Sequence, residues 1–129
     1  MSLDLKDKRI KNNLFFSFRF ALSGIVTAVK KERNLKIHLI IASIIIVLGV
    51  YYQVSAVNWM ILAIAMGLVI IMEMMNTAIE RVVDLVTKDF HPLAKEAKDI
   101  AAGAVLIAAA VSVVIGLIIF LPKIFASLF

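Results

Sequence analysis

Cysteine is absent from the 129-residue chain, and the chain has only two prolines and one tryptophan. The lack of cysteine excludes a disulfide framework, a thiolate metal site and a cysteine nucleophile. The glycine-rich phosphate loops G-x-x-x-x-G-K-[ST] and G-x-G-x-x-G are also missing. Charge is missing over two long stretches, because residues 38–72 and 100–122 contain no Lys, Arg, Asp or Glu.

The two uncharged stretches predict membrane-spanning helices. The chain is 63% hydrophobic, with a mean hydropathy of +1.02, and each stretch exceeds the ~20 residues that a spanning helix needs. The first stretch is long enough for two helices joined by a short turn. A buried hairpin in a soluble protein is disfavoured, since so short a chain has too little polar surface to cover that core. We therefore predict an all-α integral membrane protein with a single domain over residues 1–129.

The basic residues predict the orientation of the chain in the membrane. Nine of the fourteen lie in the first 36 residues and four lie between Arg81 and Lys98, whereas the 51–57 segment has none. Basic residues collect on cytoplasmic flanks. The N-terminus and the 85–98 loop are therefore expected to be cytoplasmic, and the 51–57 turn and the C-terminus to lie outside. The net charge of +5 suits anionic lipid, and no nucleic-acid partner is expected.

Four helices are expected. The first, at about 12–31, begins near Asn12 or Asn13 and carries an apolar stripe at helical spacing. We expect it to lie in the cytoplasmic interface as an amphipathic helix, because Arg19 and its basic ends disfavour a fourth span. The three spans are predicted at about 33–51, 57–86 and 92–121, with Tyr51, Tyr52 and Trp59 at the outer interface.

The second span carries carboxylates on one face. Its length of ~45 Å exceeds the ~30 Å hydrocarbon layer, and Glu73, Glu80 and Asp84 fall within ~40° of one another on a helix. Burying a carboxylate costs several kcal/mol unless it is paired, protonated or metal-bound. Glu73 is therefore a functional candidate, although a protonated Glu73 that donates to an Asn or Ser is the alternative. Glu80 is as readily explained by solvent or by pairing with Arg81 or Lys98, and Asp84 by solvent.

Other charged residues are expected at the same membrane surface. Glu32 precedes the first span, and Lys98 and Asp99 lie at the cytoplasmic start of the third. A pair of carboxylates without thiolates suits Mg²⁺, which needs one or two carboxylates together with phosphate oxygens. A lysine beside them suits phosphate. His38 and His91 are uninformative when taken alone.

The stretch EMMNTAIERVVD, followed by HPLAKEAKDIAAGAVL, resembles the prokaryotic diacylglycerol kinase family of small membrane enzymes. The family pattern is E-x-x-N-[ST]-A-I-E-x-x-x-D, then a short loop, then A-K-D with small residues after it. The matching positions are Glu73, Asn76, Thr77, Ala78, Ile79, Glu80, Asp84, Lys98 and Asp99, together with Glu32 after GIVTAVKK. The resemblance covers residues 14–115 in the same order and spacing.

The resemblance implies a bacterial plasma-membrane homotrimer that transfers the γ-phosphoryl group of ATP to a lipid hydroxyl, with Mg²⁺ as cofactor. It implies that Glu73 is the general base, that Asn76 orients the catalytic centre and that Glu32 and Glu80 are the Mg²⁺ ligands. The ATP-binding positions it implies are Glu32, Glu80, Asp89, Phe90, His91, Lys98 and Asp99.

The resemblance also bears on the lipid. ERNLKIH, residues 32–38, resembles the Gram-positive branch, whose members favour undecaprenol over diacylglycerol. The diacylglycerol branch has a tyrosine about where Phe20 stands and an acidic residue about where His38 stands. Undecaprenol is therefore the expected substrate, and diacylglycerol is the alternative.

Two other classes of function stay open at this point. A small proton-coupled transporter would use Glu73 as its carrier carboxylate, but this leaves the charges at the cytoplasmic face without a role. A scaffold that oligomerises through the alanine-rich third span leaves the carboxylates of the second span without one.

Overall fold

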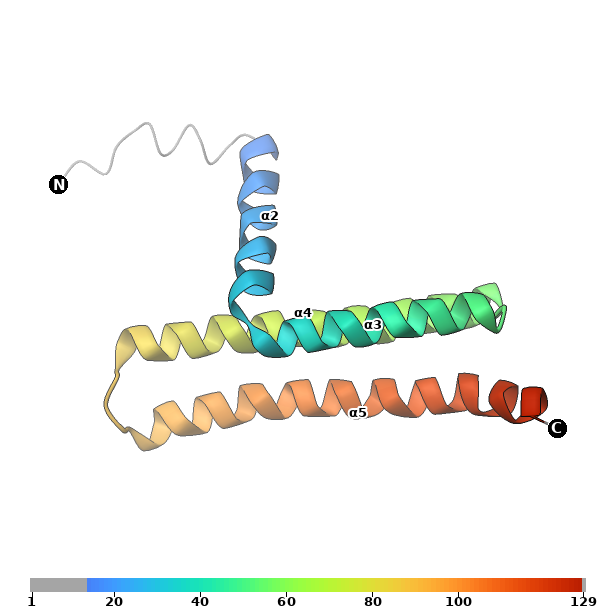
Figure 1. Cartoon of the computed structure of the whole chain (residues 1–129). Helices are drawn as coiled ribbons and strands as arrows, with labels where there is room; N and C mark the ends of the chain where they lie inside the picture. Colours follow the sequence, from blue (N-terminus) through green and yellow to red (C-terminus); the bar gives the residue numbers. More distant parts are fainter. Residues whose placement is uncertain (1–13, 129) are drawn as a thin grey trace. The chain divides into compact units, whose positions relative to one another are not determined.

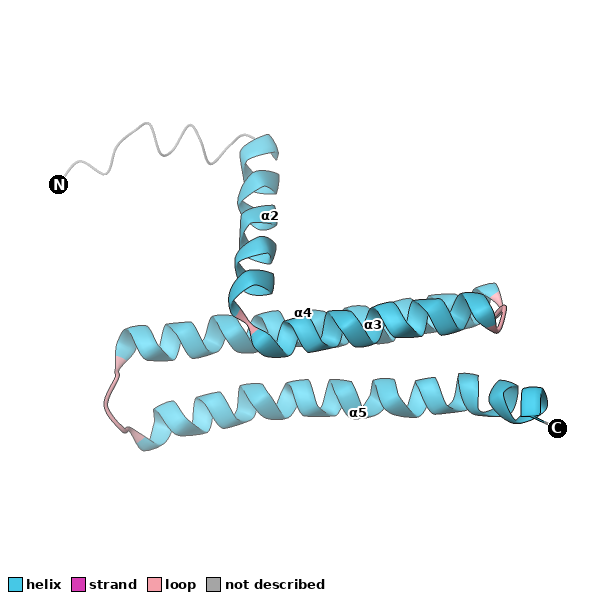
Figure 2. Cartoon of the chain, in the orientation of Figure 1, coloured by secondary structure: helices cyan, strands magenta, loops and turns pink. Residues whose placement is uncertain are grey.

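The structure is a computed structural model that describes residues 14–128, so the predicted Asn12 or Asn13 start of the first helix lies outside the described residues. The described part is all-helical and contains no strand (Figures 1 and 2). Its helices are α2 (Leu14–Lys31), α3 (Arg33–Tyr51), α4 (Ala56–Val86) and α5 (Pro92–Leu128). The last three are each long and apolar enough to cross a membrane.

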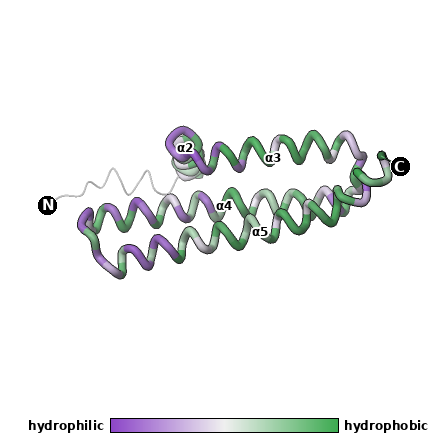
Figure 3. Tube along the Cα trace, turned by 60° about the horizontal axis from the view of Figure 1, so that its bottom comes forward, coloured by the Kyte–Doolittle hydropathy of each residue, from purple (hydrophilic) through white to green (hydrophobic). Residues whose placement is uncertain are grey.

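The chain divides into two compact units, one ending at Glu32 and one running from Arg33 onward. Within the second unit, α4 packs against both α3 and α5. Among the described residues, the backbones of α3 and α5 do not approach each other closely. Hydrophilic residues gather where α4 and α5 are joined by the 87–91 loop (Figure 3). We call this the loop end, and we call the region of the 52–55 turn the turn end.

The turn between α3 and α4 is held by a Schellman motif, in which two backbone N–H groups close the end of a helix. Val54 N donates to Gly49 O at 3.1 Å, and Gln53 N donates to Val50 O at 3.2 Å. Gln53 has a φ of 48°, in the left-handed region that most L-residues avoid. Ser55 then starts α4, because its side chain accepts a hydrogen bond from Asn58 N at 3.3 Å.

Apolar side chains fill the turn end. Val54, Leu62, Ile119 and Phe120 form a buried cluster, and partly buried neighbours including Trp59 and Tyr52 pack around it. Gly49 brings the Trp59 ring against the backbone of α3, since a Cβ at position 49 would lie 2.6 Å from Trp59 Cη2.

The last helix runs past its predicted end at Leu121. It continues through Pro122 to Leu128, and Figure 1 shows that its axis changes direction in the last turns. Proline removes one backbone N–H, which membrane helices tolerate when neighbouring groups compensate. Lys123 Nζ donates to Tyr52 O at 3.3 Å, so this turn is tied to the 52–55 turn. Similarly, α4 begins at Ala56 instead of 57 because Ser55 caps it.

Candidate active site at the loop end of α4 and α5

Three polar side chains are buried on α4 near the loop end. Glu73, Asn76 and Thr77 are only 4%, 8% and 5% exposed. They continue the buried face that Leu62, Ala65 and Val69 form nearer the turn end, because spacings of three and four residues stay on one face of a helix. The face that packs within the unit is thus apolar over its first half and polar over its second.

Asn76 is oriented by the next acidic residue on this face. Its Nδ2 donates to Glu80 Oε1 at 3.0 Å, one helical turn away. This contact fixes which end of the amide points to Glu80. Asn76 Oδ1 is buried, and none of the described residues donates to it. A buried acceptor without a donor costs about 1–3 kcal/mol, and a hydrogen-bond donor supplied by a ligand would remove this cost.

The Glu73 carboxyl likewise has no hydrogen bond or ion pair among the described residues. The alternative in which Glu73 donates to an Asn or Ser is not observed. Asn76 bonds to Glu80 instead, and the Ser112 hydroxyl donates to Ala65 O at 3.1 Å. Burying a carboxyl group without a polar partner costs free energy, so this position suits a polar group supplied by a ligand.

A cavity of about 430 Å³ lies at the loop itself. Five residues that the sequence predicted as ATP-binding line it, three from the loop and two from α5: Asp89, Phe90, His91, Lys98 and Asp99. The other two predicted ATP-binding residues do not. Glu80 lies further along α4, half-buried beside Asn76, and Glu32 is the residue between α2 and α3, in the first unit.

Two ion pairs set the charge of this cavity. Lys98 binds Asp84 across the loop, joining α5 to α4, so the suggested pairing of Lys98 with Glu80 is not the one formed. Asp84 is exposed but paired, whereas the sequence suggested only solvent. Lys95, which the sequence reading did not single out, binds Asp99 one turn along α5. The i, i+4 spacing of Lys95 and Asp99 was the available signal.

Side-chain hydrogen bonds to the backbone stabilise the loop and the start of α5. Thr87 Oγ1 accepts from Asp89 N at 3.2 Å, and His91 Nδ1 accepts from Leu93 N at 3.3 Å. The histidine therefore caps the start of α5, where Pro92 supplies the preset φ of a first helical residue. Because Nδ1 is the acceptor, the neutral ring carries its proton on Nε2, and His91 is one of the residues that line the cavity.

Comparison with known proteins identifies the family. The sequence profile described as "Prokaryotic diacylglycerol kinase" matches residues 19–120. The chain belongs to the prokaryotic diacylglycerol kinase family. It is 46% identical over 122 residues to a Bacillus subtilis protein named undecaprenol kinase, covering 94% of this chain and 99% of that protein.

Relatives with the other substrate in their name are similar over less of their length. A Synechocystis protein named diacylglycerol kinase is 42% identical, covering 88% of this chain and 66% of the relative. An Escherichia coli protein of the same name is 39% identical, covering 54% and 57%. Membership of a family of lipid kinases argues against the transporter and scaffold hypotheses. It also makes the buried polar residues of α4 candidates for a role in phosphate transfer.

Proposed function

We propose that the protein is an ATP- and Mg²⁺-dependent kinase that phosphorylates the hydroxyl of undecaprenol at the cytoplasmic face of the bacterial plasma membrane. The observation that carries the proposal is the buried Glu73, placed one turn before the Asn76–Glu80 pair at the end of an apolar span. A lipid alcohol reaches this depth from the membrane, and a nucleotide reaches the loop cavity from water. The similarity to the Bacillus subtilis undecaprenol kinase over nearly the whole chain supports this lipid.

A diacylglycerol kinase that makes phosphatidic acid is the second candidate. The 42% identity to the Synechocystis protein of that name favours it. Both candidates use the same chemistry, because each acceptor is an alcohol held at the membrane surface. They differ in what the protein must accommodate behind the hydroxyl, which is a single prenyl chain in one case and a glycerol backbone with two ester-linked acyl chains in the other.

Glu73 is the proposed catalytic base. Its carboxylate takes the proton of the lipid hydroxyl as the alcohol oxygen bonds to the γ-phosphorus and the bond from that phosphorus to the β,γ-bridging oxygen breaks, which releases ADP. The lack of a protein partner for Glu73 leaves its oxygens available for that proton. Asn76 Oδ1, the orphan acceptor beside it, is proposed to orient the hydroxyl group.

The acidic residues fit a magnesium ion that arrives with its nucleotide. The described residues contain no group of three or more His, Cys, Asp or Glu that could hold a metal on its own. Magnesium is commonly held by one or two carboxylates with phosphate oxygens and water, and Asn76 occupies only one site on Glu80 Oε1. We propose Glu80 and Glu32 as its carboxylate ligands. When bound, the ion neutralises charge on the transferring phosphates.

The loop cavity is proposed to hold the nucleotide. Lys95 and Lys98 already bind carboxylates there. When ATP binds, its phosphates would replace these carboxylates as the partners of the two lysines. His91 would donate from Nε2 while it caps α5. Exposed pairs of this kind contribute only ~0–1 kcal/mol each, so the exchange costs little.

The remaining expectations concern the setting of the site. We propose that α2 lies in the cytoplasmic interface, because its apolar residues are largely exposed in the described unit, as with Phe15 and Phe18 at 71% and 72%. The broad apolar surface of α3, α4 and α5 is proposed to be covered by lipid and by the other subunits of a homotrimer. The N-terminus and the loop are assigned to the cytoplasm and the C-terminus to the outside, on the distribution of basic residues.

The test is phosphate transfer from labelled ATP by purified protein in detergent–lipid micelles, with undecaprenol and diacylglycerol offered side by side, with and without Mg²⁺. Preferred labelling of undecaprenol, dependent on Mg²⁺, is the expected result. Preferred labelling of diacylglycerol would retain the mechanism and replace the substrate. Labelling of neither lipid in the presence of Mg²⁺ would overturn the proposal.

A further inference from the structure

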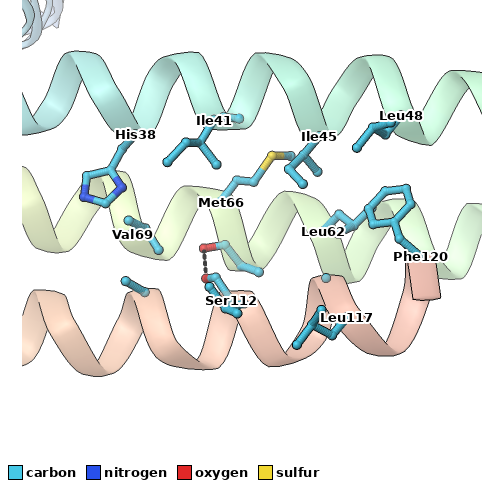
Figure 4. A pocket seen from close by; sticks show the side chains of 15 residues that line it. His38, Ile41, Ile45, Leu48, Leu62, Met66, Val69, Ser112, Leu117 and Phe120 are labelled. Atoms are coloured by element: carbon cyan, nitrogen blue, oxygen red, sulfur yellow. Dashed lines mark hydrogen bonds between the residues drawn. The ribbon is translucent and has the colours of Figure 1, made fainter. Parts of the chain in front are cut away.

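An apolar groove runs between α3 and α5, with α4 as its floor (Figure 4). It arises because both outer helices pack on α4 and not on each other. Its volume of about 370 Å³ falls in the ~300–1,000 Å³ range of small-molecule sites. The groove is separate from the loop cavity, and no residue lines both.

The groove offers hydrocarbon contacts along nearly its whole length. Its lining contains two polar residues, His38 and Ser112. The Ser112 hydroxyl is committed to Ala65 O, as the dashed line in Figure 4 shows. His38 lies beside Val69 in Figure 4, whereas Phe120 lies at the opposite end of the view. The groove thus has one polar end and one apolar end, which matches a molecule with a polar head and a hydrocarbon chain.

The polar end of the groove leads to the proposed base. Leu62, Ala65 and Val69 form its floor on α4, and Glu73 is the next buried residue on the same face. Glu73 is therefore one turn beyond the groove, ~6 Å along the helix from Val69. A molecule lying in the groove with its head toward the loop presents that head at Glu73.

We propose that this groove binds the hydrocarbon chain of the acceptor alcohol, a single long prenyl chain, with the hydroxyl at Glu73. This inference rests on the proposed function and adds the site that recognises the lipid. The groove is a single cavity of about 370 Å³; a prenol has one chain to place in it, whereas a diacylglycerol has two. The occupant is a lipid and not a helix of a second copy, because the route from the membrane to Glu73 has to stay open for substrate exchange.

The depth of the groove predicts a threshold in chain length. Leu62 lies eleven residues from Glu73, which is ~16 Å along α4. Three backbone bonds of an extended chain reach ~3.5 Å, so the four bonds of an isoprene unit reach roughly 4.5 Å and about four units span that distance. Gly116 lines the groove one turn beyond Ser112 on α5. A short prenol held at Glu73 does not reach it, and undecaprenol does.

Gly116 allows a direct test, because a Cβ there meets no atom within 4 Å. Gly116→Leu therefore adds a side chain to the groove at a position where its Cβ has open space. The matched control is Gly103→Leu on the same helix, where a Cβ also meets nothing within 4 Å and which does not line the groove. Each variant is assayed with undecaprenol and with a two-unit prenol, and KM is measured for each alcohol and for ATP.

The expected result is that Gly116→Leu raises the KM for undecaprenol about tenfold, the effect of overpacking a filled apolar site. The KM for the short prenol and for ATP should change less than twofold, and Gly103→Leu should change none of the three. An equal rise for both alcohols, or no rise for either, would overturn the groove assignment while leaving the kinase in place. Loss of the oligomer in Gly116→Leu with unchanged KM would assign the groove to a second copy. If the wild type phosphorylates neither alcohol, the proposed function falls and this inference with it.

Discussion

The turn end and the loop end of the second unit differ in the residues that they bury. At the turn end the buried residues are apolar, namely Val54, Leu62, Ile119 and Phe120. The backbone there is closed by the Schellman motif and by Ser55, and Lys123 reaches the Tyr52 carbonyl. At the loop end the most buried side chains on α4 are Glu73, Asn76 and Thr77, and the orphan Asn76 oxygen is among them.

The contrast shows how a small membrane protein separates stability from chemistry. Apolar packing and satisfied helix ends hold the helices together at one end. At the other end lie polar groups with incomplete hydrogen bonding. A stable fold does not require such groups, whereas a reacting substrate does. Substitutions at the turn end should therefore change unfolding more than turnover, and substitutions at the loop end should do the reverse.

The largest effect is expected from Glu73→Gln. Removing a general base lowers turnover by about 10²–10⁴-fold, while the loop cavity that we assign to ATP keeps all its residues. We expect phosphate transfer to fall by at least a hundredfold, with ATP affinity measured by nucleotide binding unchanged. The unfolding temperature in micelles should also stay within a few degrees of the wild type. Near-full activity in this variant would remove Glu73 from the role of base.

The next effect belongs to the turn end. Alanine at position 49 places a Cβ 2.6 Å from the Trp59 ring, and overpacking of this kind costs about 1–3 kcal/mol. Gly67→Ala is the control, because its Cβ meets nothing within 4 Å and alanine favours a helix by about 1 kcal/mol over glycine. The unfolding temperature should fall for Gly49→Ala and rise for Gly67→Ala. Trp59, the only tryptophan, should change its fluorescence in the first variant alone, and equal shifts in both would contradict the packing argument.

A third change asks whether the loop end gives up stability for function. Asn76→Leu removes the orphan oxygen and its cost of about 1–3 kcal/mol. We expect the unfolding temperature to be maintained or raised while turnover falls at least tenfold, since the hydroxyl and Glu80 lose the amide between them. The reciprocal change at the turn end, Leu62→Asn, buries a new unpaired amide and should lower the unfolding temperature. A destabilised Asn76→Leu would show that the amide holds the fold together.

Much of the fold was predictable because hydrocarbon imposes simple constraints. Uncharged runs of sufficient length, with basic residues at their flanks, predicted the three long apolar helices, since a backbone in lipid must satisfy its own hydrogen bonds. The helix α5 continues to Leu128, beyond the end of the third span that the sequence predicted at about Leu121. Proline is a strong stop signal in sequence, and the Lys123 contact with Tyr52 that supports the next turn joins residues 71 positions apart. The start of α4 differed by one residue for a local reason, the Ser55 cap.

The candidate site divides in the same way. Helical periodicity placed Glu73 and Glu80 on one face, and the family pattern pointed to the residues that line the loop cavity. The choice of partner was not in the pattern. Lys98 binds Asp84 and not Glu80, because the geometry of the 87–91 loop decides which carboxylate of α4 faces which turn of α5. The roles of Glu32 and Glu80 toward Mg²⁺ stay predictions, to be tested by metal dependence in Glu→Gln variants.

The smallest effect we predict lies in the 52–55 turn. Gln53 adopts a left-handed φ of 48°, a conformation that costs an L-residue roughly 1–2 kcal/mol and glycine nothing. Gln53→Gly should therefore raise the free energy of unfolding by up to about 1 kcal/mol, less what glycine loses through its greater freedom in the unfolded chain. Turnover should be unchanged, because the turn lies at the opposite end of α4 from Glu73. Thermal unfolding in micelles with a parallel kinase assay measures both. A change in turnover without a change in stability would mean that the two ends are coupled along α4, and the separation argued above would then fail.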